Sequence, residues 1–168
     1  MRQLKYKKME LTNMVVLEDS RQQQGKHTLK HEYFTSQGIG MVRTKLPFGD
    51  YALWGGKVSV DTKANVEEIA DNIGGKAHNR FREECKLAQA LGGQLVILVE
   101  NRNGFTCIDD VVGWINPNFR KTARSIDGPR LAKAMHTMSE RYGVRFEFCT
   151  PEESGRRVIE LLENVDDR

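Results

Sequence analysis

The chain has 168 residues, of which 39% are hydrophobic and 29% are charged. This length suffices for one buried core, and we expect residues 1–168 to form a single domain. No apolar run approaches the roughly 20 residues that cross a bilayer, and the first residues lack the apolar core of a secretory signal. The sequence therefore predicts a cytoplasmic protein that is not inserted in a membrane. The net charge of +3 is too small to identify a partner by itself.

The cysteines and histidines do not form a recognisable metal or disulfide pattern. Cys85, Cys107 and Cys149 are far apart, odd in number and without C-x-x-C spacing, so we expect free thiols. His27 and His31 share a helical face, but no third ligand accompanies them. We interpret His27 and His31 as surface residues, and His78 and His136 likewise lack metal-ligand spacing.

The first part of the chain predicts a strand, a helix and a hairpin. Residues 14–20 form an apolar run that ends in acids, which indicates a core strand. Residues 25–39 are typical of an amphipathic helix, with Gly38 as its stop. Residues 40–63 alternate apolar and polar side chains around Gly49 and a later glycine pair. This alternation predicts two antiparallel strands joined by a turn.

The second part alternates helices with strands. The continuous apolar run at residues 94–100 indicates a strand that is covered on both faces, at the centre of a sheet. Residues 101–130 form a long irregular connection that we expect to contain short structured pieces. The other expected elements are helices at 65–73, 77–91 and 130–143, a strand at 144–148 and a final helix from Thr150. The fold class is therefore α/β, with a mixed central sheet flanked by helices.

Three aspartates and a lysine stand at predicted strand ends. Asp19 closes the first strand, Asp50 follows a turn, and Asp61 and Lys63 point to one side of the next strand because strand side chains alternate. Carboxylates beside one lysine are suited to holding a magnesium ion against a phosphate. Such an ion polarises the phosphate and lowers the pKa of a bound water.

The order of these motifs resembles the XPF-type nuclease domain of the PD-(D/E)XK metal-dependent nuclease superfamily. "LEDSRQ" is similar to its D-x-R-E element, "FGDYAL" to G-D-Y, "VSVDTK" to E-R-K, and "NRFREE" to the G-R-x-x-x-Q helix. The "LVILVEN" segment resembles the core strand that follows. The resemblance implies a restriction-endonuclease-like core and a DNA endonuclease that cuts phosphodiester bonds in branched, flap or otherwise structured DNA. It implies Mg²⁺ as cofactor, with Mn²⁺ as a substitute.

The resemblance assigns roles to individual residues. It makes Asp19, Asp50 and Asp61 both catalytic residues and metal ligands, with the backbone carbonyl of Thr62 as a further ligand. It makes Lys63 the catalytic lysine, which orients the attacking water and neutralises charge in the transition state.

Two arginines of the chain match the family motifs, and three other motif positions carry a different residue from the family's. Arg21 and Arg80 match family arginines that approach phosphate or brace the acids. Asp61 and Gln22 stand where the family has Glu, and Glu84 stands where it has Gln. The change at position 22 removes an acid that a second metal would use.

A basic run between residues 120 and 133 is the second DNA-binding candidate. It contains one acid, Asp127, and we weigh phosphate contact against an ordinary solvated loop. Tyr51 and Trp54 could stack on an unpaired base or pack under the sheet, and Trp114 is equally open. Arg82 is interpreted as the exposed face of a helix. The basic residues of the run are Arg120, Lys121, Arg124, Arg130 and Lys133.

Two functional hypotheses follow from these residues. The first is the DNA endonuclease described above. The second is a non-catalytic DNA-binding or partner module. The absence of an acid at Gln22 favours this module, whereas the presence of Asp50, Asp61 and Lys63 argues against it. Glu18 or Glu32 could replace the missing acid. XPF-type nucleases of eukaryotes carry a tandem helix-hairpin-helix domain, which we do not find here. Targeting to DNA is therefore expected from the domain itself, from another protein or from a homodimer, which we prefer.

Overall fold

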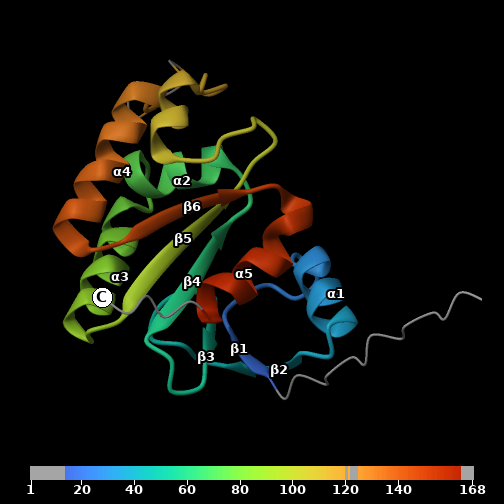
Figure 1. The fold of residues 1–168 in the computed structure, drawn as a ribbon. Helices are drawn as coiled ribbons and strands as arrows, with labels where there is room; N and C mark the ends of the chain where they lie inside the picture. The colour runs from blue at the N-terminus through green and yellow to red at the C-terminus, as the bar shows by residue number, and fades with distance from the viewer. Residues whose placement is uncertain (1–13, 120, 122–124, 164–168) are drawn as a thin grey trace, which may run out of the picture.

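The computed structural model describes residues 14–119, 121 and 125–163. Helices and strands alternate along these residues, as the periodicity of the sequence predicts (Figure 1). The strands are β1 (Val15–Asp19), β2 (Gly40–Thr44), β3 (Tyr51–Leu53), β4 (Val58–Lys63), β5 (Gln94–Glu100) and β6 (Arg145–Cys149). The α-helices are α1 (Thr28–Ser36), α2 (Val66–Gly74), α3 (His78–Ala90), α4 (Gly128–Tyr142) and α5 (Ser154–Glu163), and the 3₁₀ helices are η1 (Ile108–Gly113) and η2 (Pro151–Glu153).

The strands form one mixed six-stranded sheet in the order β2-β1-β3-β4-β5-β6. β1 is parallel to β2 and antiparallel to β3, and β3 is antiparallel to β4. β4, β5 and β6 are parallel to one another. The expected α/β class with a mixed sheet is therefore confirmed.

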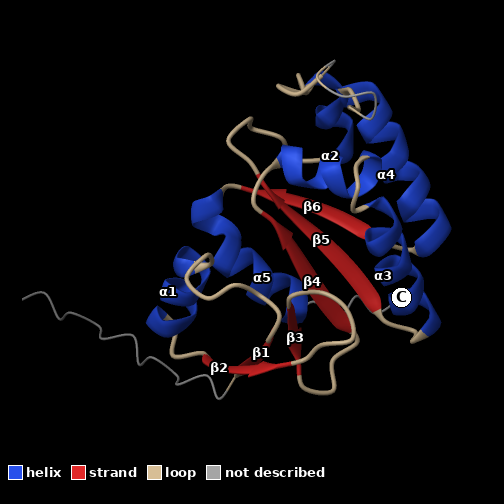
Figure 2. Ribbon diagram, turned by 180° about the vertical axis from the view of Figure 1, so that it is seen from behind, coloured by secondary structure: helices blue, strands red, loops and turns tan. Residues whose placement is uncertain are grey.

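Helices cover both faces of the sheet and bury two apolar clusters. One cluster lies under α2, α3 and α4 and includes Phe81, Ile97 and Leu131. The other lies under α1 and α5 and includes Phe34 and Val158. Figure 2 shows α2, α3 and α4 gathered on one side and α1 with α5 on the other. Because strand side chains alternate, β5 supplies residues to both clusters, and every residue after Gln94 in it is buried.

The segment at residues 40–63 differs from the prediction of two antiparallel strands. It contains three strands, and the first, β2, pairs in parallel with β1 instead of joining the hairpin. Only β3 and β4 form the hairpin. The chain leaves the line of β2 near Pro47 and turns at Gly49, whose φ of +73° suits glycine. Alternation identifies strands but not their partners, which explains the error.

The later elements match their predictions closely. α2, α3, α4, β5 and β6 fall within two residues of the expected ranges, and η1 is a structured piece inside the long connection. β5 is an interior strand, but it is next to the edge strand β6 instead of at the centre. The final helix begins after Thr150 with a 3₁₀ turn that contains Pro151.

The structure also bears on the cysteines and on the length of the apolar helices. Cys85 and Cys149 are buried free thiols, and Cys107 is an exposed one, as expected. Within the same residues, no helix combines the length and the apolar character that spanning a bilayer requires.

Candidate active site

Three strands bring Asp19, Asp50 and Asp61 to one edge of the sheet. β1 runs toward this edge and ends at Asp19, while the antiparallel β3 begins there, directly after Asp50. β4 returns to the same edge through Asp61. The backbone of Asp50 joins its neighbours: its oxygen accepts from Asp19 N at 2.8 Å, and its nitrogen donates to Val60 O at 2.8 Å. Sheet pairing therefore gathers acids that lie far apart in the sequence.

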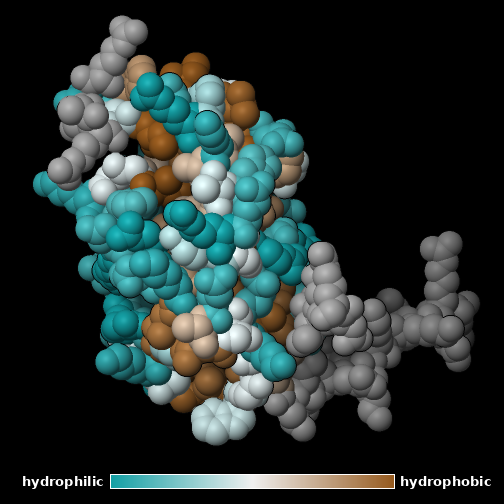
Figure 3. All heavy atoms as spheres, turned by 90° about the vertical axis from the view of Figure 1, so that its left-hand side faces the viewer, coloured by the Kyte–Doolittle hydropathy of each residue, from teal (hydrophilic) through white to brown (hydrophobic). Residues whose placement is uncertain are grey.

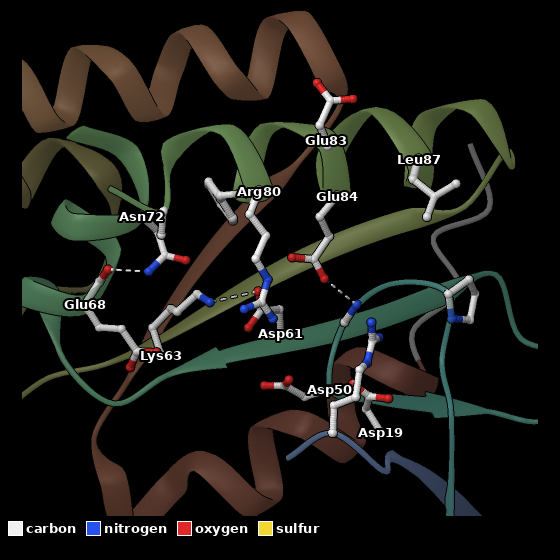
Figure 4. Close-up of a pocket in the computed structure, with 15 residues that line it drawn as sticks. Asp19, Asp50, Asp61, Lys63, Glu68, Asn72, Arg80, Glu83, Glu84 and Leu87 are labelled. Carbon is white, nitrogen blue, oxygen red and sulfur yellow. Dashed lines mark hydrogen bonds and ion pairs between the residues drawn. The ribbon is translucent and has the colours of Figure 1, made fainter. Parts of the chain in front are cut away.

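These residues open into a cleft of about 440 Å³ between the sheet edge and α3. Figure 4 shows Asp19 and Asp50 on one side of the cleft, Asp61 and Lys63 on the strand beside it, and Glu84 and Arg80 extending from α3. All predicted catalytic side chains line one space. The predicted residues in its lining are Asp19, Arg21, Asp50, Asp61, Lys63 and Arg80.

Asp19 and Asp50 are held by neighbouring protein donors. Arg21 Nε lies 2.8 Å from Oδ2 of Asp19, and Leu46 N donates to its Oδ1 at 3.2 Å. Thr62 donates to Oδ2 of Asp50 twice, from its nitrogen at 2.8 Å and from its hydroxyl at 3.0 Å. Thr62 therefore fixes the orientation of Asp50. Its predicted carbonyl contact with metal stays a prediction.

Asp61 and Lys63 form a buried ion pair on one face of β4. Lys63 Nζ lies 3.0 Å from Asp61 Oδ2 and 5.7 Å from the centre of the Phe81 ring. Burial, followed by the charges of Asp50 and Glu84, raises the pKa of Asp61 well above its ordinary value, against the opposing effect of Lys63. Burial alone would lower the pKa of Lys63, but the adjacent Asp61 outweighs it and raises that pKa. Lys63 thus stays charged, whereas ionisation of Asp61 places its carboxylate under electrostatic strain.

This strain predicts that Asp61→Asn will stabilise the protein at neutral pH. A raised pKa means that the folded state binds the proton more tightly, so wild-type stability falls as pH rises above about 4, the ordinary pKa of aspartate. We expect the variant to melt a few degrees higher at pH 7, with the difference vanishing near pH 4. Thermal unfolding across this pH range measures the effect. Asp71→Asn, at an exposed position of α2, is the matched control, and equal melting of wild type and Asp61→Asn at pH 7 would contradict the expectation.

α3 supplies a wall of the cleft that the motif comparison only partly identified. Arg80, Glu84 and Leu87 recur at helical spacing and line the cleft. Oε1 of Glu84 accepts from Gly49 N at 2.8 Å, which ties α3 to the turn before Asp50. In the sequence, Glu84 was noted only as a departure from the motif. Its spacing of four residues from Arg80 on the same helix is the signal that could have placed it in the cleft. Further lining residues missed from the sequence are Glu68, Asn72 and Glu83.

Gly49 places Asp50, and its substitution should disturb the site. A Cβ at Gly49 would lie 2.2 Å from Ser59 Oγ, which itself donates to backbone oxygens on both sides of this turn. We expect Gly49→Ala to destabilise the fold by more than about 2 kcal/mol, because it adds this clash to a strained φ. Gly55 has a similar φ of +72° with open space around it, so Gly55→Ala reports the backbone strain alone. Urea unfolding of both variants separates the cost of the clash from the cost of the backbone strain. Equal losses of unfolding free energy in Gly49→Ala and Gly55→Ala would show that the structure relieves the clash.

The acids provide the oxygen ligands that a hard divalent cation needs. Within the described residues, Asp50 and Asp61 each keep one carboxylate oxygen without a hydrogen bond, whereas both oxygens of Asp19 accept one. In the same part of the chain, no three acidic, histidine or cysteine side chains are grouped closely enough to hold an ion as they stand. Asp50 and Asp61 thus offer free oxygen atoms of the kind that magnesium binds, but the acids would have to move closer together to share one ion.

Gln22 lies outside the cleft lining, so the absence of an acid there removes no carboxylate from it. Glu18 is buried on the opposite face of the sheet, where His31 lies 2.9 Å from its Oε1. Glu18 therefore does not replace the missing acid. The His31 side chain is half-buried because it is the polar partner of the buried Glu18 carboxylate. The interpretation of His31 as a surface residue is therefore wrong.

The basic run and the aromatic residues fall in several places. Lys121 is exposed and bonds to Asn118, and Arg130 lines a different cavity. Tyr51 is fully buried, whereas the Trp54 side chain is 87% exposed at the β3–β4 turn and Trp114 is buried. Arg120 and Arg124 lie outside the described residues.

Comparison with known proteins does not place the chain in a family. No protein-family model matches the sequence, and no curated protein sequence matches it. The functional argument therefore depends on the cleft and on the motifs that line it.

Proposed function

We propose that the chain is a magnesium-dependent DNA endonuclease with a restriction-endonuclease-like core of the PD-(D/E)XK type. The observation that carries the proposal is the convergence of Asp50, Asp61 and Lys63, from two neighbouring strands, on one cleft that Asp19 also lines. Their order is that of the motif resemblance, with Asp61 in place of the family's glutamate. The raised pKa of Asp61 also supports it, because a buried carboxylate under repulsion gains stability from a bound cation.

The metal ligands are Asp50 and Asp61, with Asp19 as the third carboxylate. Magnesium held there would polarise a phosphate oxygen and stabilise charge on the leaving oxygen. Thr62 contributes by orienting Asp50 through two hydrogen bonds. Glu84 holds the preceding turn in place through Gly49.

Lys63 acts through its charge. Its raised pKa keeps the ammonium group protonated, so the group donates hydrogen bonds to the attacking water and the phosphate and does not remove a proton. The water oxygen bonds to phosphorus and the water gives up one proton to solvent, the ester bond from phosphorus to the leaving oxygen breaks, and the leaving oxygen takes up a proton from solvent. Burial strengthens the attraction between Lys63 and the developing negative charge.

Arg80 provides positive charge at the mouth of the cleft, whereas Arg21 braces Asp19 through an ion pair. The Arg21 side chain is half-exposed and Arg80 is exposed, so both are accessible to a phosphate backbone. Such contacts position a nucleic acid without reading its bases. This arrangement fits selection of branched, flap or otherwise structured DNA by shape.

A cleavage assay tests the proposal. We expect labelled forks, flaps and junctions to be cut with Mg²⁺ or Mn²⁺, linear duplex to be cut less, and EDTA to abolish cutting. Asp50→Asn protein, prepared in parallel, is the control for a contaminating nuclease. Intact substrates under all metal conditions would reject the endonuclease and favour a non-catalytic DNA-binding module.

A further inference from the structure

A second cavity lies on the other side of the α2–α3 junction from the acidic cleft. It has a volume of about 420 Å³ and separates the end of α2 and the first turns of α3 from α4. We name it the α3–α4 groove. Its apolar lining consists of Ile73, Ala134, Met138 and Tyr142, all packed on the main core.

The polar lining of this groove is almost entirely basic. No aspartate or glutamate belongs to its lining, in contrast to the cleft, where acids outnumber bases. Figure 3 shows the side of the molecule where α3 and α4 lie, with mainly hydrophilic side chains and apolar ones between them. The basic residues that line the groove are His78, Arg82, Arg130, Lys133 and Arg141.

Three cations of the groove also lack acidic partners. Within the described residues, no carboxylate lies within 4.0 Å of the side chains of Arg130, Lys133 or Arg141. Arg82 has only a distant carboxylate, 3.8 Å away on Glu83, and its Nε has no hydrogen-bond partner in this part of the chain. Among the arginines that the structure describes outside the groove, most are neutralised at shorter range. The closely paired ones are Arg21, Arg102, Arg145, Arg156 and Arg157.

Unneutralised positive charge around one groove indicates an external polyanion. Internal ion pairs leave little charge for a ligand, whereas free guanidinium and ammonium groups bind phosphates and release counterions. The apolar lining adds a surface on which sugars and base faces can pack. An occupant with repeated negative charges and flat apolar groups therefore fits the groove.

The groove and the cleft lie on opposite sides of α3 and approach each other at its N-terminal end. Arg80 lines the cleft and Arg82 the groove, two residues apart and so on nearly opposite faces of the helix, and the adjacent residues Ala77 and His78 at the start of α3 divide in the same way. A strand that leaves the cleft would pass this end of α3 to reach the groove. We propose that the α3–α4 groove binds the phosphate backbone of the DNA strand that flanks the scissile phosphate. This inference rests on the proposed function, because that function supplies the polyanion.

DNA binding by a groove variant tests the inference. Labelled branched DNA is titrated with wild type and with the triple variant Arg130→Ala, Lys133→Ala, Arg141→Ala in Ca²⁺, followed by fluorescence anisotropy. We expect the triple variant to bind about tenfold or more weakly, and the slope of log K against log salt to fall by about one per lost contact. The matched control removes the same charge elsewhere with Lys57→Ala, Arg102→Ala and Arg156→Ala, and should bind within about twofold of wild type. Equal melting temperatures of variant and control exclude a folding defect.

A cross-linking measurement keeps the inference testable if the triple variant unfolds. Thr137 lines the groove, so p-benzoylphenylalanine at position 137 should cross-link to DNA on irradiation, whereas the same group at Glu140, which is not in the lining, should not. Wild-type affinity of the folded triple variant, or no cross-link from position 137, would overturn the inference and leave the groove to an acidic protein segment. If the triple variant binds DNA as tightly as wild type while Asp50→Asn abolishes cleavage, only the inference about the groove is rejected. If the triple variant binds more weakly but the wild type cuts no DNA, only the nuclease proposal is rejected.

Discussion

Replacing Lys63 with alanine is expected to lower the rate of DNA cleavage by about a hundredfold to a thousandfold, as the loss of one buried electrostatic donor does in other active sites. The ammonium group is buried in the cleft beside Asp61, 3.0 Å away, so water cannot replace its charge fully. Single-turnover cleavage with saturating enzyme measures the rate without a contribution from weaker binding. Lys57→Ala, at an exposed lysine near the opposite end of β4, is the matched control.

The acids provide a second readout of the same site. Asp50→Asn and Asp61→Asn should also lose cleavage, while Asp61→Asn gains melting temperature at neutral pH because it relieves repulsion. A purely structural residue would lose activity together with stability, so opposite signs identify a residue kept for function. Cleavage at the wild-type rate by Lys63→Ala or by Asp50→Asn would remove the substituted residue from the mechanism.

The largest loss of stability is expected from breaking the buried ion pair between Lys30 and Glu100. Lys30 of α1 reaches Glu100 at the end of β5, and both side chains are buried. Lys30→Ala leaves a carboxylate uncompensated in the core, which costs about 3–5 kcal/mol. Chemical denaturation at pH 7 measures the loss.

Two controls separate charge from volume. The double variant Lys30→Met, Glu100→Leu should recover most of the lost stability, because apolar residues of similar size often replace a buried pair without cost. Arg102 and Glu152 form an exposed pair, so Arg102→Ala should cost less than about 1 kcal/mol. A loss for Lys30→Ala as small as for Arg102→Ala would mean that the pair does not anchor α1 to the sheet.

Local sequence patterns predicted the elements and part of the cleft. Alternation placed Asp61 and Lys63 on one face of a strand, and the ion pair between them confirms this. Arg80 and Glu84 stand four residues apart on α3 and line the same cleft, so helical spacing could have placed Glu84 there, although the motif comparison identifies it only as a departure from the motif. Signals of this kind depend on neighbouring residues in the chain and need no knowledge of packing.

The remaining features depend on contacts between distant segments. Alternation could not reveal that β2 pairs with β1, because the pattern of a strand does not specify its partner. The bonds from Thr62 to Asp50 require the exact juxtaposition of two strands. Arg130 appeared as part of a basic run, but its place in the α3–α4 groove follows from how α4 packs beside α3.

A crystal structure with Mn²⁺ tests the central claim most directly. Manganese scatters anomalously and uses the same oxygen ligands as magnesium, so its position is found without assumptions about the ligands. We predict an anomalous peak about 2.1–2.3 Å from carboxylate oxygens of both Asp50 and Asp61, with Asp19 bound directly or through water. A well-diffracting crystal soaked at millimolar Mn²⁺ with no peak in this cleft would contradict the proposal that these acids form a catalytic metal site.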